Sequence, residues 1–298
     1  SMSNDGTVGN DLVKYTCSHC GAEIITDRST AATVCVYCGN AVIMGEQIID
    51  NFSPDYVIPF KVPKNQVMDA FKKFSKKPLT PKDFSCDKVV DKMQGVYIPF
   101  WLYSGNCEGS ITAEGINTRT WTSGNYRYTE KKYYSVYRNG TLDFKAVPVD
   151  ASSKTDDDAM DSIEPFDYSE MTAFNPGYLS GYLAERYDED KDKCLPRAKE
   201  RIENTTRDEL RNTCNYNSVN VQSYEKHTEI KDVKYAMLPT WLLYTTYQDK
   251  PYFFAMNGQT GKFIGNLPIS KGKLVAYSLL GGVGGYIIGA ILQIMGIF

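Results

Sequence analysis

The chain has 298 residues, of which 42% are hydrophobic and 13% aromatic, so it can bury a sizeable core in two folded units and a tail. This composition excludes disorder for most of the chain. The net charge of −3 argues against wholesale nucleic-acid binding, which needs a clustered positive surface. Residues 1–14 begin with small, polar, Gly- and Asn-rich sequence, and we expect a flexible N-terminal arm there.

Residues 15–48 contain two Cys-x-x-Cys-Gly motifs separated by fourteen residues, formed by Cys17 and Cys20 and by Cys35 and Cys38. This is the ligand spacing of a tetrahedral zinc ribbon with a closed, structural Zn²⁺ site. Two disulfides or a redox pair are the alternative, but a redox motif needs only one Cys-x-x-Cys beside a βαβ unit. His19, inside the first motif, is expected at the surface. Zinc thiolates need a reducing compartment, which predicts a cytoplasmic location.

Residues 55–270 contain two passages that resemble one another, and we interpret them as a duplicated α+β body. Each has a helical segment, then an apolar strand with Pro and Trp, then a second strand and a glycine turn. In the first passage the helix is expected at 65–77, the strand carries Pro99 and Trp101, and the turn is at Gly115. In the second passage the helix is expected at 196–214, with Pro196 in its first turn, the strand carries Pro239 and Trp241, and the turn is at Gly258. Trp101 and Trp241 are interpreted as core anchors, with ligand stacking as the alternative.

Three further local signals lie within the body. Asn139-Gly140 predicts a hairpin turn joining strands at 126–137 and 141–149. Asn175-Pro176-Gly177 predicts a break before a helix at 178–188, with Glu185 and Arg186 pointing outward as a structural pair. A buried ion pair or polar site formed by these two residues is the alternative. The segment 61–92 has nine lysines against four aspartates, which suits either anionic lipid or a plain solvated helix face.

Residues 274–298 form a run of twenty-five residues without a charge, which predicts a C-terminal transmembrane helix. A buried terminal helix is the alternative, but glycines at this density are costly in water. Gly281, Gly285 and Gly289 recur every fourth residue and predict close packing against another helix, in a homo-oligomer or with a protein partner. Lys271 and Lys273 precede the run, so the positive-inside rule places the soluble part on the cytoplasmic side of a tail-anchored protein at the cell membrane.

The sequence contains several longer motifs, which are Val57-Ile-Pro-Phe-Lys61, Gly95-Val-Tyr-Ile-Pro-Phe-Trp101, Val149-Asp-Ala-Ser152, Ile163-Glu-Pro-Phe166, the run 174–187 and Asn257-Gly-Gln-Thr-Gly-Lys262. Together with the cysteine pairs, these motifs resemble a family of bacterial zinc-ribbon membrane proteins. Members are labelled as transcription-factor-IIB-type zinc-ribbon proteins or as primosomal replication helicases. The resemblance covers nearly the whole chain, implies proximity to flotillin-like membrane scaffolds, and supplies no catalytic residue.

The motifs of common enzymes are not matched in the sequence. Gly258-Gln-Thr-Gly261-Lys262 lacks the spacing of a Walker phosphate loop, and no Gly-x-Ser-x-Gly nucleophile elbow occurs. Asp150 and the run 156–158 lack the spacing of a calcium loop. We therefore expect a non-enzymatic, membrane-anchored interaction or scaffold protein, for which nucleic acid is an unlikely partner. A membrane-tethered nucleic-acid-associated factor is the alternative, and an enzyme with a site between the repeats comes third.

Overall fold

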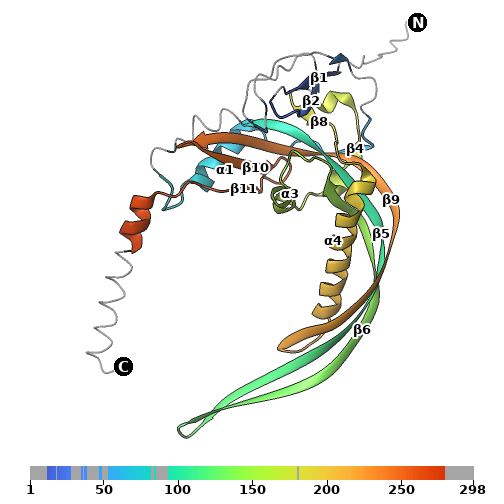
Figure 1. Ribbon diagram of the computed structural model, residues 1–298, viewed down its shortest axis with the longest axis vertical. Coiled ribbons are helices and arrows are strands. Elements are labelled where there is room, and N and C mark those ends of the chain that lie inside the picture. The colour runs from blue at the N-terminus through green and yellow to red at the C-terminus, as the bar shows by residue number, and fades with distance from the viewer. Residues whose placement is uncertain are drawn as a thin grey trace.

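The computed structural model describes residues 12–17, 19–27, 35, 37–38, 47–48, 53–81, 84, 93–179 and 181–278. Within these ranges the fold is mixed α+β, with one sheet of eleven strands and helices packed against it (Figure 1). The strands of the main path are, from one edge to the other, β11 (Phe263–Gly265), β10 (Lys250–Asn257), β9 (Ser218–Tyr247), β5 (Gln94–Ser123), β8 (Leu183–Glu185), β2 (Glu23–Asp27), β1 (Leu12–Thr16) and β3 (Gln47–Ile48). The expected α+β class is therefore confirmed. The flexible segment predicted at residues 1–14 lies largely outside the described residues.

The N-terminal strands continue directly into the sheet of the body. β1 (Leu12–Thr16) pairs antiparallel with β2 (Glu23–Asp27) and with β3 (Gln47–Ile48). β2 also pairs with β8 (Leu183–Glu185), so that Ile24 lies opposite Glu185. Cys17, Ala22, Ile24 and Cys35 belong to the same buried cluster as Ile98 and Phe100 of the body. The cysteine-containing segment and the body thus share a sheet and a core.

Three long antiparallel strands form the largest feature of the molecule. They are β5 (Gln94–Ser123), β6 (Tyr126–Asp150) and β9 (Ser218–Tyr247), with β5 in the middle. At about 3.3 Å per residue, thirty residues of β5 extend roughly 100 Å. We call residues 105–147 with 218–230 the arm, which curves away from the body in Figure 1. Register shifts at Gly105 and at Thr112/Ala113 mark irregularities in the β5 pairings.

The hairpin predicted at Asn139-Gly140 is wrong, as is the turn at Gly115. Asn139 and Gly140 lie inside β6, where Gly140 pairs with Gly109 of β5. The chain turns instead at Gly124 and the following Asn125, where Gly124 has a φ of +58°. Gly109 serves the close approach of a helix, because a Cβ there would lie 2.9 Å from Thr206 and 3.1 Å from Leu210.

That helix is α4 (Lys191–Asn212), which lies along the concave side of the arm (Figure 1). Asp190 caps it by accepting hydrogen bonds from two backbone N–H groups of the first turn. Its buried face repeats every fourth residue, through Cys194, Ala198, Ile202, Thr206 and Leu210. The helix begins five residues before Pro196, which therefore lies inside it rather than in the first turn as expected.

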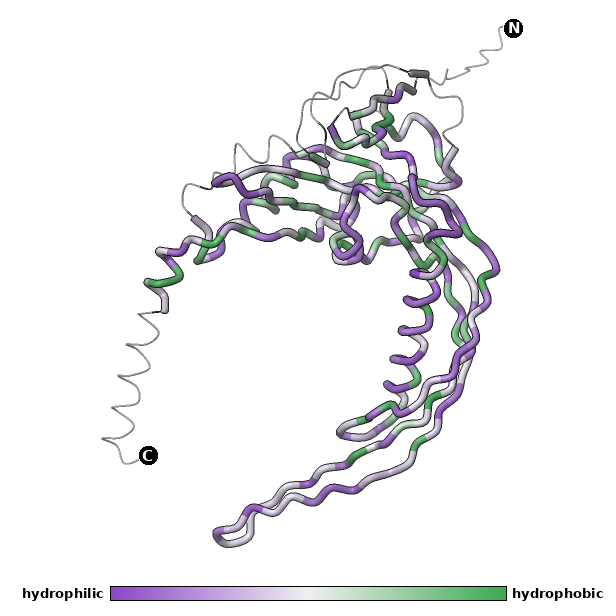
Figure 2. Tube along the Cα trace, viewed as in Figure 1, coloured by the Kyte–Doolittle hydropathy of each residue, from purple (hydrophilic) through white to green (hydrophobic). Residues whose placement is uncertain are grey.

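The other helices cover the body. α1 (Lys64–Ser75) confirms the helix predicted at 65–77 and packs Val67 and Phe71 against β10 (Lys250–Asn257), whose neighbour is β11 (Phe263–Gly265). α3 (Asp157–Ile163) contacts both of these strands. The remaining short elements are β4 (Tyr56–Val57), the 3₁₀ turns η1 (Tyr168–Glu170) and η2 (Pro176–Leu179), and β7 (Thr172–Ala173). Figure 2 shows the hydrophobic residues concentrated in this body.

The helix predicted at 178–188 is wrong. Gly181 has a φ of +78°, which interrupts a helix, and the next residues form β8 between β5 and β2. Leu183 and Ala184 pair with Val96 and Tyr97 of β5, which buries this short strand on both sides. Glu185, expected to point outward, is consequently only 2% exposed.

The two Pro-Trp passages make matching backbone contacts. Pro99 O accepts from Ala151 N, and Pro239 O accepts from Gly258 N. The carbonyl oxygens of Ala151 and Gly258 each accept two N–H groups, from residues 188 and 189 and from residues 61 and 62 respectively.

The indoles of the same passages match as well. Trp101 Nε1 donates to Glu189 O, and Trp241 Nε1 donates to Val62 O, both at 2.9 Å. Each acceptor precedes the first residue of a helix by two positions, α4 in one case and α1 in the other. Both tryptophans therefore anchor the fold, as their core interpretation predicts.

The C-terminal end of the described chain is a helix that begins at residue 271 and is described to residue 278. Among the described residues, no helix has the length and apolar character needed to cross a membrane. Most of the predicted span at 274–298 lies outside the described residues, and so do Gly281, Gly285 and Gly289.

Candidate metal centre

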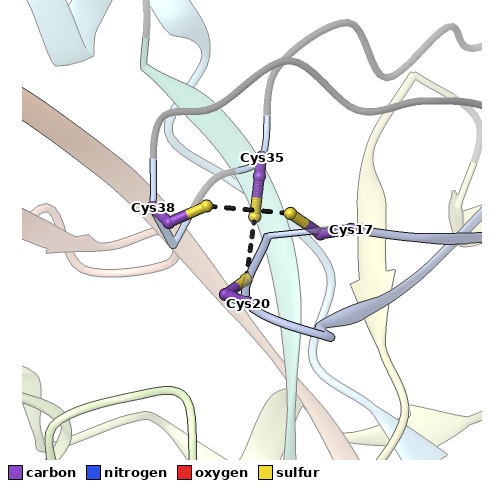
Figure 3. A group of neighbouring side chains, drawn as sticks. All are labelled: Cys17, Cys20, Cys35 and Cys38. Atoms are coloured by element: carbon purple, nitrogen blue, oxygen red, sulfur yellow. Dashed lines mark hydrogen bonds between the residues drawn. The ribbon is translucent and has the colours of Figure 1, made fainter.

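Four sulfur atoms converge at one point beside the N-terminal strands. The Sγ atoms of Cys17, Cys20, Cys35 and Cys38 all lie within 4.8 Å of one another (Figure 3). Cys17 Sγ and Cys38 Sγ are 3.7 Å apart, and Cys20 Sγ and Cys35 Sγ are 3.6 Å apart. The structure therefore brings together all four predicted ligands.

The first pair of cysteines is positioned by the turn between β1 and β2. Gly21 N donates to Cys17 O at 2.8 Å, and Cys17 N donates to Ala22 O at 2.9 Å. Gly21 has a φ of +72°, a conformation that favours glycine and explains the residue that follows the cysteine pair. The expected exposure of His19 is confirmed, because its side chain lies on the surface beside this turn.

The sulfur spacing fits a tetrahedral metal and does not fit disulfides. Bonds of about 2.3 Å to a central zinc place the sulfurs of a tetrahedron about 3.8 Å apart. A disulfide requires about 2.05 Å, and none of the four cysteines is joined in a disulfide. The cluster is thus a four-thiol site that matches a metal ion in number, geometry and ligand softness.

The first cysteine is already disposed toward the thiolate form. Burial acts to raise the pKa of Cys17, but hydrogen bonds with the backbone of Cys20 and His19 outweigh it and hold the pKa at about 7. Burial raises the pKa of Cys35 and outweighs the backbone hydrogen bonds from Tyr37 and Cys38, which act to lower it. A divalent cation among the four sulfurs would favour the thiolate at every position, because its charge offsets the desolvation of each anion.

A buried polar chain connects this centre to the body. Tyr37, between the two cysteines of the second motif, donates its hydroxyl to Glu185 of β8 at 2.5 Å. Ser152 donates to the other oxygen of the same carboxylate at 2.7 Å. Burial raises the pKa of Glu185 to about 7, against the lowering effect of these two hydroxyl groups. Lys154 Nζ also reaches Cys20 O, at 3.1 Å.

The sequence does not reveal the roles of Tyr37 and Ser152. Glu185 forms the buried polar site that was the alternative to an outward position, but with these two residues and on a strand rather than with Arg186 on a helix. The available signal was the run Leu183-Ala184, two apolar residues directly after a glycine and a tyrosine, which is also compatible with a short buried strand.

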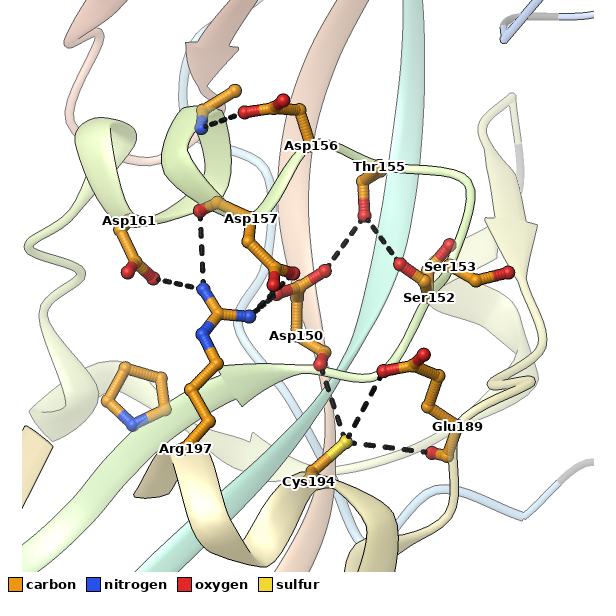
Figure 4. A network of polar contacts seen from close by, with 12 residues as sticks. Asp150, Ser152, Ser153, Thr155, Asp156, Asp157, Asp161, Glu189, Cys194 and Arg197 are labelled. Atoms are coloured by element: carbon orange, nitrogen blue, oxygen red, sulfur yellow. Dashed lines mark hydrogen bonds and ion pairs between the residues drawn. The ribbon is translucent and has the colours of Figure 1, made fainter. Parts of the chain in front are cut away.

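Asp150 and Asp157, two of the acidic residues compared with a calcium loop, contact an arginine instead (Figure 4). Arg197 of α4 contacts Asp150 at 2.6 Å, Asp157 at 2.6 Å and Asp161 at 2.9 Å. One turn later, Arg201 contacts Asp161 and Glu164. Asp150 is 1% exposed, so the guanidinium of Arg197 offsets the burial of its charge. The ion pairs of these acids with Arg197 and Arg201 join α3 and the end of β6 to α4.

A mixed α+β fold with an N-terminal cluster of four cysteines defines the class of this protein. The chain is 38% identical over 317 residues to the Uncharacterized protein YdjG of Bacillus subtilis (strain 168), across 89% of this chain and 93% of that protein. The chain belongs to the same family as YdjG. No protein-family model matches it. No solved structure matches it either.

Proposed function

We propose that the protein is a membrane-anchored interaction or scaffold protein that performs no chemistry of its own, with a structural zinc ribbon on a cytoplasmic body. The observation that carries the interaction role is the arm, whose far end exposes several large aromatic side chains. Exposed aromatic groups gathered in one place are typical of binding surfaces rather than of a monomer's general surface.

Zinc is the proposed occupant of the four-thiol site. Four cysteines with two on each of two tight turns suit a closed tetrahedral zinc, which supplies folding energy and leaves no coordination position for a substrate. The link from Tyr37 to Glu185 supports a structural role, because it ties the site to the core of the body rather than to an open cleft.

The body is proposed to be a duplicated unit. The matching contacts of Pro99 with Pro239, of Ala151 with Gly258 and of Trp101 with Trp241 support this interpretation. β5 and β9 pair so that Ile98 lies opposite Leu238. These two residues occupy the same place in their passages, one position before the proline, so an approximate two-fold axis would pass between them.

Membrane anchoring is proposed from the sequence of residues 274–298. They hold no charge, and Lys271 and Lys273 precede them, which favours a cytoplasmic body. The Gly281, Gly285 and Gly289 series supports helix packing within the bilayer, with a second copy or another membrane protein as partner. Flotillin-like scaffolds are the proposed neighbours.

Membrane fractionation tests this proposal. The full chain is expected in the membrane pellet after high-salt and alkaline washes, whereas a variant that ends at Lys273 is expected in the wash. Release of the full chain by either wash would overturn the anchor. For the glycine series, Gly285→Leu is expected to reduce crosslinked oligomers in membranes, with Ala290→Leu, which would lie on the opposite face of the helix, as the matched control.

A further inference from the structure

The end of the arm is a two-stranded extension, and among the described strands no third one pairs with it. The pairing of β9 with β5 stops at Ser218 and Ile116, while β5 and β6 remain paired as far as Ser123 and Tyr126. We call residues 117–132 the arm tip. Nearly all of its side chains are exposed. A two-stranded hairpin is marginal alone, so the rest of the arm holds this one in shape.

One face of the arm tip gathers large aromatic side chains. Trp121 lies opposite Tyr128 and the two rings stack, with centroids 5.6 Å apart and planes 14° apart. Tyr126, 71% exposed, pairs with Ser123 two residues beyond Trp121 and therefore shares this face. Period-two alternation places the same residues on the side of Ala113 and Val136, which pack against α4. The aromatic face thus continues the concave side of the arm.

The arm tip is also basic, in contrast to the chain as a whole. It has Arg119, Arg127, Lys131 and Lys132 against Glu130, a net charge of +3 within a protein whose net charge is −3. Arg119, Lys132 and Glu130 share the aromatic face by their register, which gives this face a net charge of +1. Glu130 lies 3.8 Å from Lys132 in an ion pair, and Arg127 and Lys131 fall on the opposite face. Arg119 lies over the Trp121 ring, with its guanidinium carbon 5.6 Å from the centroid.

This combination fits the surface of an anionic bilayer. Trp and Tyr prefer the headgroup region, where an apolar ring and a polar tip are both accommodated, and lysine and arginine are attracted to anionic headgroups. Single-stranded nucleic acid also uses aromatic and basic groups, but it stacks its bases on free ring faces. Here Trp121 and Tyr128 each use one ring face on the other, and Arg119 also lies over the Trp121 ring, so fewer ring faces are open to bases.

The position of the arm tip in the molecule agrees with this assignment. The arm tip and the helix that begins at residue 271 form the two ends of one arc, which open on the same concave side (Figure 1). Ile269, Leu274, Val275 and Tyr277 are exposed at the other end of the arc. The uncharged segment that follows in the sequence would bring a lipid surface to this side.

We propose that the concave face of the arm tip, with Trp121, Tyr126 and Tyr128 beside Arg119 and Lys132, binds the surface of an anionic phospholipid bilayer. This inference rests on the proposed membrane anchor, to which it adds a second, electrostatic contact at the far end of the arc. The arm tip would then recognise phosphate-bearing, negatively charged headgroups, and its docking would fall as salt screens the attraction.

Fluorescence of Trp121 tests the proposal in the full chain. The difference between the wild-type and Trp121→Phe spectra reports this one indole. It is measured with phosphatidylcholine vesicles and with vesicles in which roughly one lipid in three is phosphatidylglycerol, an anionic content that attracts basic side chains. We expect a blue shift and quenching by lipids brominated on the acyl chain with the anionic vesicles, both lost at high salt. An unchanged Trp121 signal would overturn the proposal.

Charge variants separate lipid binding from other causes. Arg119→Gln with Lys132→Gln is expected to reduce the equilibrium constant for docking about thirty-fold, as each basic residue contributes about one kcal/mol near an anionic surface. Lys145→Gln with Lys231→Gln removes the same charge from exposed positions outside the arm tip and is expected to leave the signal unchanged. Equal effects of the two variants would contradict a specific contact.

The remaining outcomes are also distinguishable. A Trp121 shift that grows with protein concentration in the absence of lipid would overturn the proposal in favour of a second copy of the chain. A response to single-stranded RNA but not to vesicles would overturn it in favour of nucleic acid. Retention on phosphatidylcholine vesicles after a salt wash tests the anchor alone, so the anchor and the arm tip can fail independently.

Discussion

Glu185 is a carboxylic acid held in the core by two hydroxyl groups, those of Tyr37 and Ser152. Burial raises its pKa from 4.5 to about 7, so ionisation is less favourable in the folded protein than in the unfolded chain. A raised carboxyl pKa gives stability that is complete below pH 4.5 and is lost as the pH rises through 7. The residue that joins the cysteine cluster to the body is therefore sensitive to pH.

Glu185→Gln is expected to remove this dependence. The full loss that comes from Glu185 is about 3 kcal/mol, of which about 1 kcal/mol falls between pH 6 and pH 8, where thiolate sites retain zinc. Urea unfolding of the zinc-loaded chain across this range measures the slope of the unfolding free energy with pH. Glu200→Gln, on the exposed side of α4, is the matched control and should keep the wild-type slope. Equal slopes in all three proteins would contradict the prediction.

At the scale of elements, the irregularities in β5 depend on glycine. A Cβ on Gly105 would lie 2.1 Å from the backbone oxygen of Glu229 on β9, which is an impossible contact. This is also where the pairings of β5 with both neighbours shift register. In contrast, a Cβ on Gly140 meets only Leu210, at an ordinary 3.5 Å.

Gly105→Ala is expected to lower the free energy of unfolding by about 2 to 4 kcal/mol, because β9 must move away from β5. Gly140→Ala, on the neighbouring strand, is expected to change it by less than about 0.5 kcal/mol. Chemical denaturation followed by circular dichroism compares the two variants. Similar stabilities would mean that the pairing near residue 105 is looser than the structure shows.

At the scale of the whole molecule, the cysteine cluster and the body share one core. Cys17 and Cys35 are buried among residues of the body, and β2 pairs with β8. A separate zinc-dependent module, as the sequence alone suggests, would unfold on chelation and leave the body intact. The shared sheet predicts instead that the loss of metal reaches the body.

Removal of metal by a chelator is expected to lower the melting temperature of the body by about 5 °C or more, because the metal stabilises only the folded state. Fluorescence of Trp101 and Trp241, which anchor the body, follows its unfolding. A Cys17→Ser, Cys35→Ser variant should melt near the chelated temperature and show no further change with chelator. A body that melts at the same temperature with and without metal would contradict the shared core.

The amino-acid sequence by itself determined the features that depend on near neighbours. The four ligands follow from two short motifs, because each pair of thiols is positioned by a single turn. Helix α1 follows from the spacing of Val67, Phe71 and their neighbours, since helical hydrogen bonds join residues four apart. The mixed α+β class followed from such local patterns, taken together along the chain.

Only the tertiary structure decided the features that depend on distant strands. Asn139-Gly140 favours a turn locally, yet the backbone here continues as a strand because β6 pairs with β5 on both sides of these residues. Helix α4 also packs beside them, through Leu210. Leu183 and Glu185 suggest a helix, yet β2 and β5 enclose them in a sheet. The partners of these residues lie some thirty to one hundred and sixty positions away, so their energies outweigh local preference without leaving a signal in the nearby sequence.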